Sequence, residues 1–217
     1  MSAGKQVNES LLSMNTNDQE IEAKFYIQNL AALEERLKKQ GGVPVQPRVF
    51  ERNLRFDTPD RSLSRDLRVL RLRQDTRARL TFKGPAAAGE AVSIRQEIEV
   101  EVADFDATRR LLEALGYEIS VMYEKYRTSY DFQSCEVSLD EMPFGNFAEI
   151  EGPGTDAILA AATALGLDWS ARASMSYLAL FSNLKTRFGL TMPHLTFDAF
   201  QGRSFTAADF DLKPADR

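Results

Sequence analysis

The chain has 217 residues, of which 43% are hydrophobic and 27% are charged, and Cys135 is its only cysteine. This length suits one well-buried domain with a modest appendage, and the composition is typical of a globular chain rather than a disordered or membrane-spanning one. The formal net charge of -5 gives no overall basic field, so nucleic acid is not expected as a partner. A single cysteine excludes a disulfide framework and a thiolate metal site, and it favours a cytoplasmic location.

The segment 1–18 lacks the apolar core of a signal peptide, and no run in the chain is long enough to cross a bilayer. We therefore expect residues 1–18 to be a mobile polar lead-in and expect no membrane partner. The folded domain is predicted over 19–189. The remaining residues, 190–217, show no clear periodicity and are predicted to form an irregular tail.

Alternation of charged and apolar residues predicts a first strand over Gln19–Ile27, with Glu20, Glu22 and Lys24 on one face. Periodicity, capping residues and turn residues predict the rest of the chain in the same way. The further predicted elements are a helix over 29–40, a strand and bend over 51–60, a hairpin over 68–74 and 77–83, a strand over Ser93–Val102, a helix over 104–115, strands over 121–132, 135–141 and 147–151, and helices over 155–165 and 175–184.

Strand after strand in this prediction has one face of formal charges and one apolar face. The carboxylates in i, i+2 pairs are Glu20, Glu22, Glu97, Glu99, Glu101, Glu149 and Glu151, and the cations are Lys24, Arg71, Arg73, Lys83, Lys125 and Arg127. Helices need an apolar surface to pack on, so the charged faces are predicted to point inward if the sheet closes into a barrel. Because buried ions must be paired or coordinate a ligand, the interior is predicted to be a wet, charged tunnel.

Clustered carboxylates repel one another and become stable when a hard divalent cation lies between them. Lysine and arginine on the opposite wall need anions, and their geometry suits phosphoryl oxygens. A polyphosphate chain with bound metal ions satisfies both walls, so phosphoryl or nucleotidyl transfer is the favoured reaction class. The alternative is a solvated sheet face whose cross-strand salt bridges each contribute little.

The same residues fall into an ordered series of motifs. They are ExExK at Glu20 to Lys24, FDTPD at 56–60, LRLR at 70–73, LTFKGP at 80–85, QEIEVEV at 96–102, EKYR at 124–127, SLDEMPFGNFAEIEG at 138–152 and SYLAL at 176–180. This series, over roughly 19–184, resembles the CYTH domains, also called triphosphate tunnel metalloenzymes. The resemblance implies an α+β fold in which a closed eight-stranded antiparallel β-barrel is flanked by α-helices.

The resemblance also implies roles for individual residues. It implies metal ligation by Glu20, Glu22, Glu97, Glu99, Glu149 and Glu151, and it leaves open whether Glu101 faces inward. It implies triphosphate binding by Lys24, Arg71, Arg73, Lys83, Lys125 and Arg127. Among these, Lys24, Arg71 and Lys83 are assigned the catalytic role. The implied metal is Mg²⁺ or Mn²⁺, and the implied partner is tripolyphosphate, thiamine triphosphate or ATP, with a homodimer as a further expectation.

Family members include triphosphatases and class IV adenylate cyclases, and the tunnel motifs do not choose between them. The sequence favours hydrolysis of a terminal phosphate, with a cyclase that makes cyclic AMP and pyrophosphate from ATP as the second interpretation. A binding module without catalysis is the third. Replacing Glu20 or Glu22 by alanine is expected to abolish activity and to spare the fold, because carboxylate repulsion would be relieved.

For several residues the sequence allows a structural role as well as a functional one. Asp140 is either a metal ligand or a carboxylate at a turn, and Asp57 and Asp60 are expected to shape the bend at Pro59. Tyr177 and Phe181, at helical spacing, are expected in the core rather than as a platform for a base. Other residues with an ordinary structural interpretation are His194 in the tail, Cys135 in a strand, and Lys185 and Arg187 at a helix end.

Overall fold

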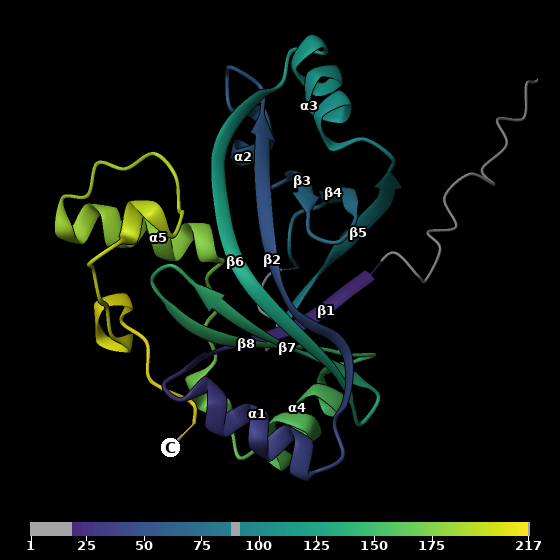
Figure 1. Ribbon diagram of the computed structural model, residues 1–217. Helices are drawn as coiled ribbons and strands as arrows, with labels where there is room; N and C mark the ends of the chain where they lie inside the picture. The colour runs from purple at the N-terminus through teal and green to yellow at the C-terminus, as the bar shows by residue number, and fades with distance from the viewer. Residues whose placement is uncertain (1–18, 88–91, 217) are drawn as a thin grey trace, which may run out of the picture.

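A computed structural model of the chain describes residues 19–87 and 92–216, so the prediction for residues 1–18 lies outside the described part. This part contains eight strands and five α-helices in an α+β arrangement (Figure 1). The strands are β1 (Gln19–Ile27), β2 (Val43–Asp57), β3 (Val69–Gln74), β4 (Ala78–Lys83), β5 (Ser93–Val102), β6 (Glu118–Phe132), β7 (Cys135–Met142) and β8 (Gly145–Glu151). The helices are α1 (Leu30–Lys39), α2 (Ser62–Arg65), α3 (Phe105–Ala114), α4 (Thr155–Ala164) and α5 (Tyr177–Phe188), with 3₁₀ turns η1 (Trp169–Ala171), η2 (Asp198–Phe200) and η3 (Ala207–Phe210). Along the described residues, β3, β4 and β5 and then β6, β7 and β8 follow one another without a helix between them.

Every strand pairs with two antiparallel neighbours. The order is β1-β5-β4-β3-β2-β6-β7-β8, and β8 pairs back to β1, with Lys24 opposite Glu149. The hydrogen-bonded pairs therefore form a ring, in agreement with the predicted closure of the sheet. Because side chains alternate along each strand, such a ring separates the inward residues from the outward ones.

Among the strands, the longest differences from the predicted boundaries lie in β2 and β6. β2 begins at Val43 rather than at residue 51, and β6 begins at Glu118 rather than at residue 121. Pro44 and Pro47 interrupt the pattern of β2, and its pairing with β6 shifts register on either side of Gln46. Proline cannot donate a ladder hydrogen bond and is tolerated at such irregularities, which explains why the sequence did not indicate a strand there.

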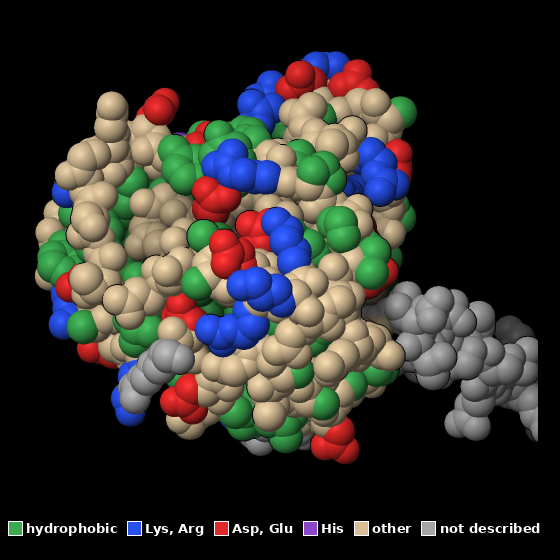
Figure 2. Space-filling view, turned by 60° about the horizontal axis from the view of Figure 1, so that its bottom comes forward, with side chains coloured by type: hydrophobic (Ala, Val, Ile, Leu, Met, Phe, Trp, Pro, Cys, Tyr) green, Lys and Arg blue, Asp and Glu red, His purple; other side chains and the backbone are tan. Residues whose placement is uncertain are grey.

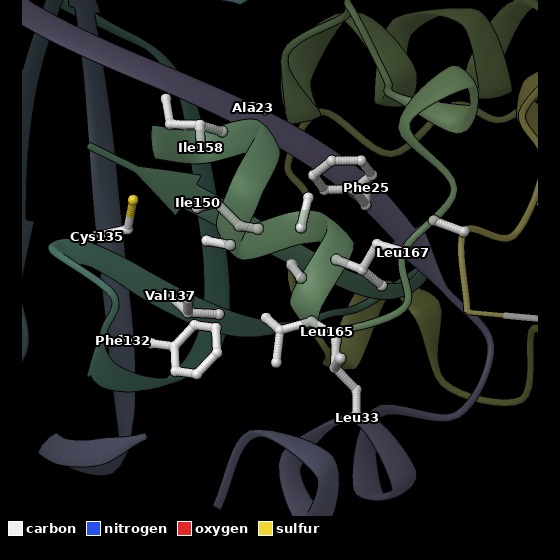
Figure 3. Close-up of a cluster of buried hydrophobic side chains, with 14 of the residues drawn as sticks. Ala23, Phe25, Leu33, Phe132, Cys135, Val137, Ile150, Ile158, Leu165 and Leu167 are labelled. Atoms are coloured by element: carbon white, nitrogen blue, oxygen red, sulfur yellow. The ribbon is translucent and has the colours of Figure 1, made fainter. Parts of the chain in front are cut away.

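Apolar residues of the strands lie on the outside of the ring, where helices cover them. α1 and α4 pack over β1, β7 and β8, in a cluster that contains Phe25, Leu33, Ile150 and Ile158 (Figure 3). α3 packs over β2 and β3 through residues such as Phe105 and Leu112. The prediction that leucines of the hairpin face outward, beneath helices, is confirmed by Leu72, which is fully buried in this second cluster.

Side chains at the helix starts accept hydrogen bonds from free backbone N–H groups. Asn29 accepts one from Ala32, Asp104 from Ala107 and Ser176 from Ala179. The first two confirm predicted helix starts, whereas α5 starts at Tyr177 and runs to Phe188, longer than the predicted 175–184. Gly189 ends α5 with φ 62, a left-handed conformation that glycine adopts at low cost. Within the described residues, no helix has the length and apolar character needed to cross a membrane.

The described residues after Gly189 pack on the ring of strands, although their sequence has no periodicity. The backbone N–H of Leu195 donates to Met122 of β6 at 2.9 Å, and that of Ala215 donates to Tyr26 of β1 at 3.0 Å. Leu195, Phe200 and Phe210 are buried with α5 in a third apolar cluster. Individual buried apolar side chains, rather than a regular apolar face, attach this segment to the rest of the structure, which explains why its sequence shows no periodicity.

The apolar cluster under α4 provides a test of this packing. Ile158→Ala is expected to lower the free energy of unfolding by about 2–5 kcal/mol, because it leaves a cavity in a fully buried position. Leu159→Ala, at the next position of the same helix, removes a side chain that is 37% exposed and should cost about 1 kcal/mol or less. Urea denaturation of the two variants measures the difference. Equal losses would contradict the assigned burial.

Candidate active site

The ring of strands encloses an open cavity of about 510 Å³. Ten lysine and arginine side chains and eight glutamates line it, with few apolar residues between them. Figure 2 shows basic and acidic side chains gathered beside one another in the middle of one face of the molecule. All twelve residues predicted for the site lie in this lining: Glu20, Glu22, Lys24, Arg71, Arg73, Lys83, Glu97, Glu99, Lys125, Arg127, Glu149 and Glu151. By contrast, Glu101 is exposed and pairs with Arg77 at 3.2 Å.

One ionic cluster joins the first strand to the β4–β5 hairpin. Glu20 accepts hydrogen bonds from Lys83 at 2.5 Å and from Arg95 at 2.8 Å. Burial alone would raise the pKa of Glu20, but the two cations outweigh it and lower the pKa to about 2. Lys83 also lies 3.0 Å from Glu97. Glu20 is therefore held as a carboxylate by its own neighbours.

A second cluster is centred on Asp140, which is fully buried. Its carboxylate accepts hydrogen bonds from Lys125 at 2.9 Å, from Nε and Nη2 of Arg127 at 2.6 Å each, and from the Tyr177 hydroxyl at 2.8 Å. Arg127 also bonds to Glu149. Asp140 thus lies neither at a turn nor among the crowded carboxylates; it fixes two of the cavity cations and the first residue of α5.

Glu149 and Tyr177 complete the surroundings of Lys24. Lys24 lies 3.1 Å from Glu149 and 4.4 Å from the centre of the Tyr177 ring. Burial opposes ionisation of Glu149, yet Lys24 and Arg127 hold its pKa well below the usual range. Tyr177 therefore belongs both to the apolar cluster under α5, as predicted, and to the wall of the cavity.

The central wall is made of arginines and two glutamates. Glu51 is almost fully buried, 3.7 Å from Arg73 and 3.6 Å from Lys125. Burial raises its pKa, and the surrounding cations outweigh this and lower the pKa to about 2. Glu99 lies 3.2 Å from Arg73 and 3.6 Å from Arg79. Glu99, predicted as a metal ligand, is thus surrounded by arginines in this structure.

Carboxylates crowd one another on the opposite wall. Glu22 faces Glu151 in the strand register, and removal from water, Glu149 and Glu20 together raise the pKa of Glu22. Removal from water and neighbouring glutamates raise the pKa of Glu151 to about 7. Such a set of oxygen donors gains stability from a divalent cation, so its chemistry fits Mg²⁺ or Mn²⁺.

Within the described residues, no three acidic, histidine or cysteine side chains lie close enough together to hold a metal ion by themselves. Mg²⁺ commonly binds through one or two carboxylates together with substrate phosphates and water. The pair of Glu22 and Glu151 provides that number of protein ligands. A metal at this wall would therefore need oxygens of the substrate or water to complete its coordination.

Fifteen lining residues were not in the predicted site, among them Glu51, Arg55, Arg95, Tyr123 and Tyr177. Arg95 could have been found, because it alternates with Glu97 and Glu99 on the same strand face. Tyr123 and Tyr177 gave no such signal, since tyrosine in a strand or an amphipathic helix is typical of a core residue. Only the pairing of distant strands brings them to the cavity.

The remaining candidates have structural contacts. His194 accepts a hydrogen bond from the backbone N–H of Met122, and Cys135 is buried in the cluster under α4. Asp57 accepts backbone N–H bonds from Thr58, Leu63 and Ser64, as expected for a residue that shapes the bend. The rest of this group comprises Asp60, bonded to Thr58 and Arg65, Phe181 in the core, Lys185 over the Phe181 ring, and Arg187 paired with Asp211.

Comparison with known proteins extends this description. The sequence model of the CYTH domain matches residues 18–165. A protein of Methanocaldococcus jannaschii named "Putative adenylate cyclase" is 30% identical over 134 residues, which cover 61% of this chain and 75% of that protein.

Two solved structures share the fold. A protein of Vibrio parahaemolyticus with the same name is 23% identical and has a TM-score of 0.68, and the match covers 75% of this chain and 97% of that one. A Hippeastrum protein named "Putative adenylyl cyclase" is described as revealing a dominant triphosphatase activity. It is 19% identical with a TM-score of 0.58, and the match covers 75% of this chain and 95% of that one.

The matched segment 18–165 contains all eight strands and every residue predicted for the site. The fold of the two solved structures agrees with the ring of strands found here. This chain therefore belongs to the CYTH domain family.

Proposed function

We propose that this chain is a divalent-metal-dependent triphosphatase that hydrolyses the terminal phosphate of inorganic tripolyphosphate or of an organic triphosphate inside a closed tunnel. One observation carries the proposal: basic and acidic side chains from all eight strands line a single cavity. The cations suit phosphoryl oxygens, and the crowded carboxylates suit a metal that bridges to those oxygens.

In this proposal the cations do most of the work on the substrate. Lys24, Arg71 and Lys83 would contact the reacting phosphoryl group and stabilise the charge that grows on its oxygens. Lys125 and Arg127, fixed by Asp140, would hold the rest of the phosphate chain in line. Because their carboxylate partners are already in place, these side chains need little reorganisation when the substrate enters.

Glu22 and Glu151 are the proposed holders of the metal, with the other predicted carboxylates beside them. When bound, Mg²⁺ or Mn²⁺ would supply positive charge for the phosphate oxygens and activate a water molecule for attack. Glu20 is proposed to act differently from Glu22, because Lys83 and Arg95 already neutralise it. It would keep those two cations pointing into the tunnel.

The described activity of the Hippeastrum protein supports hydrolysis. The name of the Methanocaldococcus jannaschii protein supports a second candidate, an adenylate cyclase. In a cyclase the ribose hydroxyl of ATP would attack the α-phosphorus, and the products would be cyclic AMP and pyrophosphate. The charged side chains of the cavity wall suit either reaction, so identification of the products distinguishes hydrolysis from cyclisation.

A panel of tripolyphosphate, thiamine triphosphate and ATP, each with Mg²⁺ and with Mn²⁺, tests the proposal. Orthophosphate release that is lost in EDTA is the expected outcome. Cyclic AMP and pyrophosphate from ATP, without orthophosphate, would establish the cyclase instead. Tight binding without any turnover would leave a binding module and reject both enzymes.

Replacing Glu20 and replacing Glu22 are expected to change the stability of the protein in opposite directions, whereas the sequence suggested the same effect for both. The pKa of Glu20 is lowered, so its ionised form stabilises the fold fully at pH 8, and Glu20→Gln should lower the melting temperature of the metal-free protein. The pKa of Glu22 is raised, so its ionisation at pH 8 costs stability, and Glu22→Gln should raise that temperature. Each shift should be on the order of 2–4 °C, the effect of about 1 kcal/mol in a chain of this size.

Thermal unfolding in EDTA at pH 8 measures both shifts. At pH 3 Glu22 is expected to be protonated. The rise in melting temperature caused by Glu22→Gln should then disappear, because the native glutamate is neutral as well. Shifts of the same sign at pH 8 would contradict the separation of the two roles. Both variants are expected to lose activity.

Tyr177→Phe tests whether α5 contributes to the tunnel wall. Loss of the hydroxyl leaves Asp140 with only Lys125 and Arg127 as donors, so both cations should be held more tightly and offered less to phosphate. We expect kcat/KM to fall about tenfold, mainly through KM, which corresponds to losing about 1.4 kcal/mol.

Tyr130→Phe is the matched control, because it removes a hydroxyl bond of 2.6 Å to Glu34 outside the cavity. It should leave kcat/KM within about twofold of the wild type. If both tyrosine variants have the same kinetics, Tyr177 has only a packing role.

A further inference from the structure

Arg55 of β2 is the exception among the basic residues of the cavity. The other nine lysine and arginine side chains of the lining each form an ion pair with a carboxylate. In the part of the chain that the structure describes, the Arg55 guanidinium has neither an ion pair nor a hydrogen bond, and its Nε is buried without a partner. Arg55 is half-buried, and a charge that is partly removed from water without a partner costs free energy, so an anion would be stabilised at this position.

The surroundings of Arg55 increase that cost. Arg55 faces Arg71 across the β2–β3 pair, and Arg95 is also close enough to affect it. Burial, the largest cause, acts with Arg71 and Arg95 to lower the pKa of Arg55, and the electrostatic effects of Tyr123 and Asp57 offset this only in part. Three guanidinium groups thus concentrate positive charge at one place in the cavity wall.

The nearest carboxylate along the strand, Asp57, lies close enough to affect the pKa of Arg55 but forms no ion pair with it. Asp57 lies on the same face of β2, but its two oxygens accept bonds from the backbone N–H groups of Thr58, Leu63 and Ser64 at 2.8 to 3.1 Å. They also accept the Ser64 hydroxyl at 2.5 Å. These hydrogen bonds stabilise the bend before α2, so both carboxylate oxygens of Asp57 already have donors other than Arg55.

A neutral donor lies beside the arginines. The Tyr123 hydroxyl accepts a bond of 3.4 Å from Arg71, and within the described residues its own proton has no acceptor. The Nε atoms of Arg55 and Arg71 are both buried without a partner. Arg55, Arg71 and Tyr123, from β2, β3 and β6, all line the cavity, and each has at least one donor without a partner among the described residues.

We propose that Arg55, together with Arg71 and Tyr123, forms an additional oxyanion subsite that binds a phosphoryl group of the substrate. A phosphoryl group has several oxygens for the arginine forks and for the phenol, whereas a single carboxylate would satisfy fewer of these donors. The subsite rests on the proposed function in that the phosphoryl group belongs to the triphosphate. It does not depend on whether hydrolysis or cyclisation follows.

The test compares Arg55→Gln with Arg52→Gln, which removes the same charge from the same strand on its outer face, where Arg52 lies over the Phe105 ring. Calorimetric titration of tripolyphosphate into the metal-free protein in EDTA measures binding. Arg55→Gln is expected to raise the dissociation constant about tenfold or more, since a charge-assisted contact is lost. Arg52→Gln should stay within about twofold of the wild type, and Arg55→Lys should lie between.

Thermal unfolding without ligand gives an independent readout. Because Arg55 is an unpaired charge among like charges, Arg55→Gln is expected to raise the melting temperature while it weakens binding. An arginine that serves the fold would do the opposite. Unchanged tripolyphosphate binding by Arg55→Gln, a lower melting temperature, or no binding by the metal-free wild type would overturn the subsite.

These outcomes are separable from those of the proposed function. If the wild type makes cyclic AMP and releases no orthophosphate, the triphosphatase is rejected while the binding result for Arg55 stands. If the wild type releases orthophosphate and Arg55→Gln binds tripolyphosphate normally, the triphosphatase stands and the subsite falls.

Discussion

Charges enclosed by a ring of strands must be compensated inside that ring. The cavity lining has ten basic and eight acidic side chains, and nearly every cation has a carboxylate partner within it. An ion pair taken out of water is stable only if its geometry and its hydrogen bonds are good, which explains why Asp140 and Glu20 each serve more than one donor. The remaining structure follows from this inward placement of charge.

With the charges inside, the outer face of the ring is left apolar, and the helices cover it in three places. The coverage also gives the C-terminal part of the chain a role in the cavity. α5 and the residues after it pack together, and the first residue of α5, Tyr177, reaches Asp140. The segment matched by the family, 18–165, therefore does not contain the whole cavity wall.

Opposite charges are not balanced equally in every part of the cavity, and the unbalanced parts indicate which ligands would bind there. Glu22 and Glu151 are crowded by other carboxylates, whereas Arg55 is crowded by other arginines. The first imbalance suits a divalent cation and the second suits an oxyanion. A metal-bound triphosphate carries both charges, so a single ligand would relieve both imbalances.

The sequence by itself determined the strands, their charged faces and twelve of the residues that line the cavity, because alternation along a strand is local and leaves a period of two. The motif series extended this to the family. Local pattern failed at β2, where prolines hid a strand start, and after Gly189, where isolated apolar anchors replace periodicity.

Only the tertiary structure decided which charges are neighbours. Glu20 and Glu22 look alike in the motif, yet the tertiary structure gives Glu20 hydrogen bonds from two cations, whereas Glu22 lies opposite Glu151 and has Arg95 only at 3.6 Å. Arg55 looks like any arginine of a strand until pairing with β3 places it opposite Arg71. Electrostatic energy depends on distances across strands that are far apart in sequence, and no single-strand pattern contains those distances.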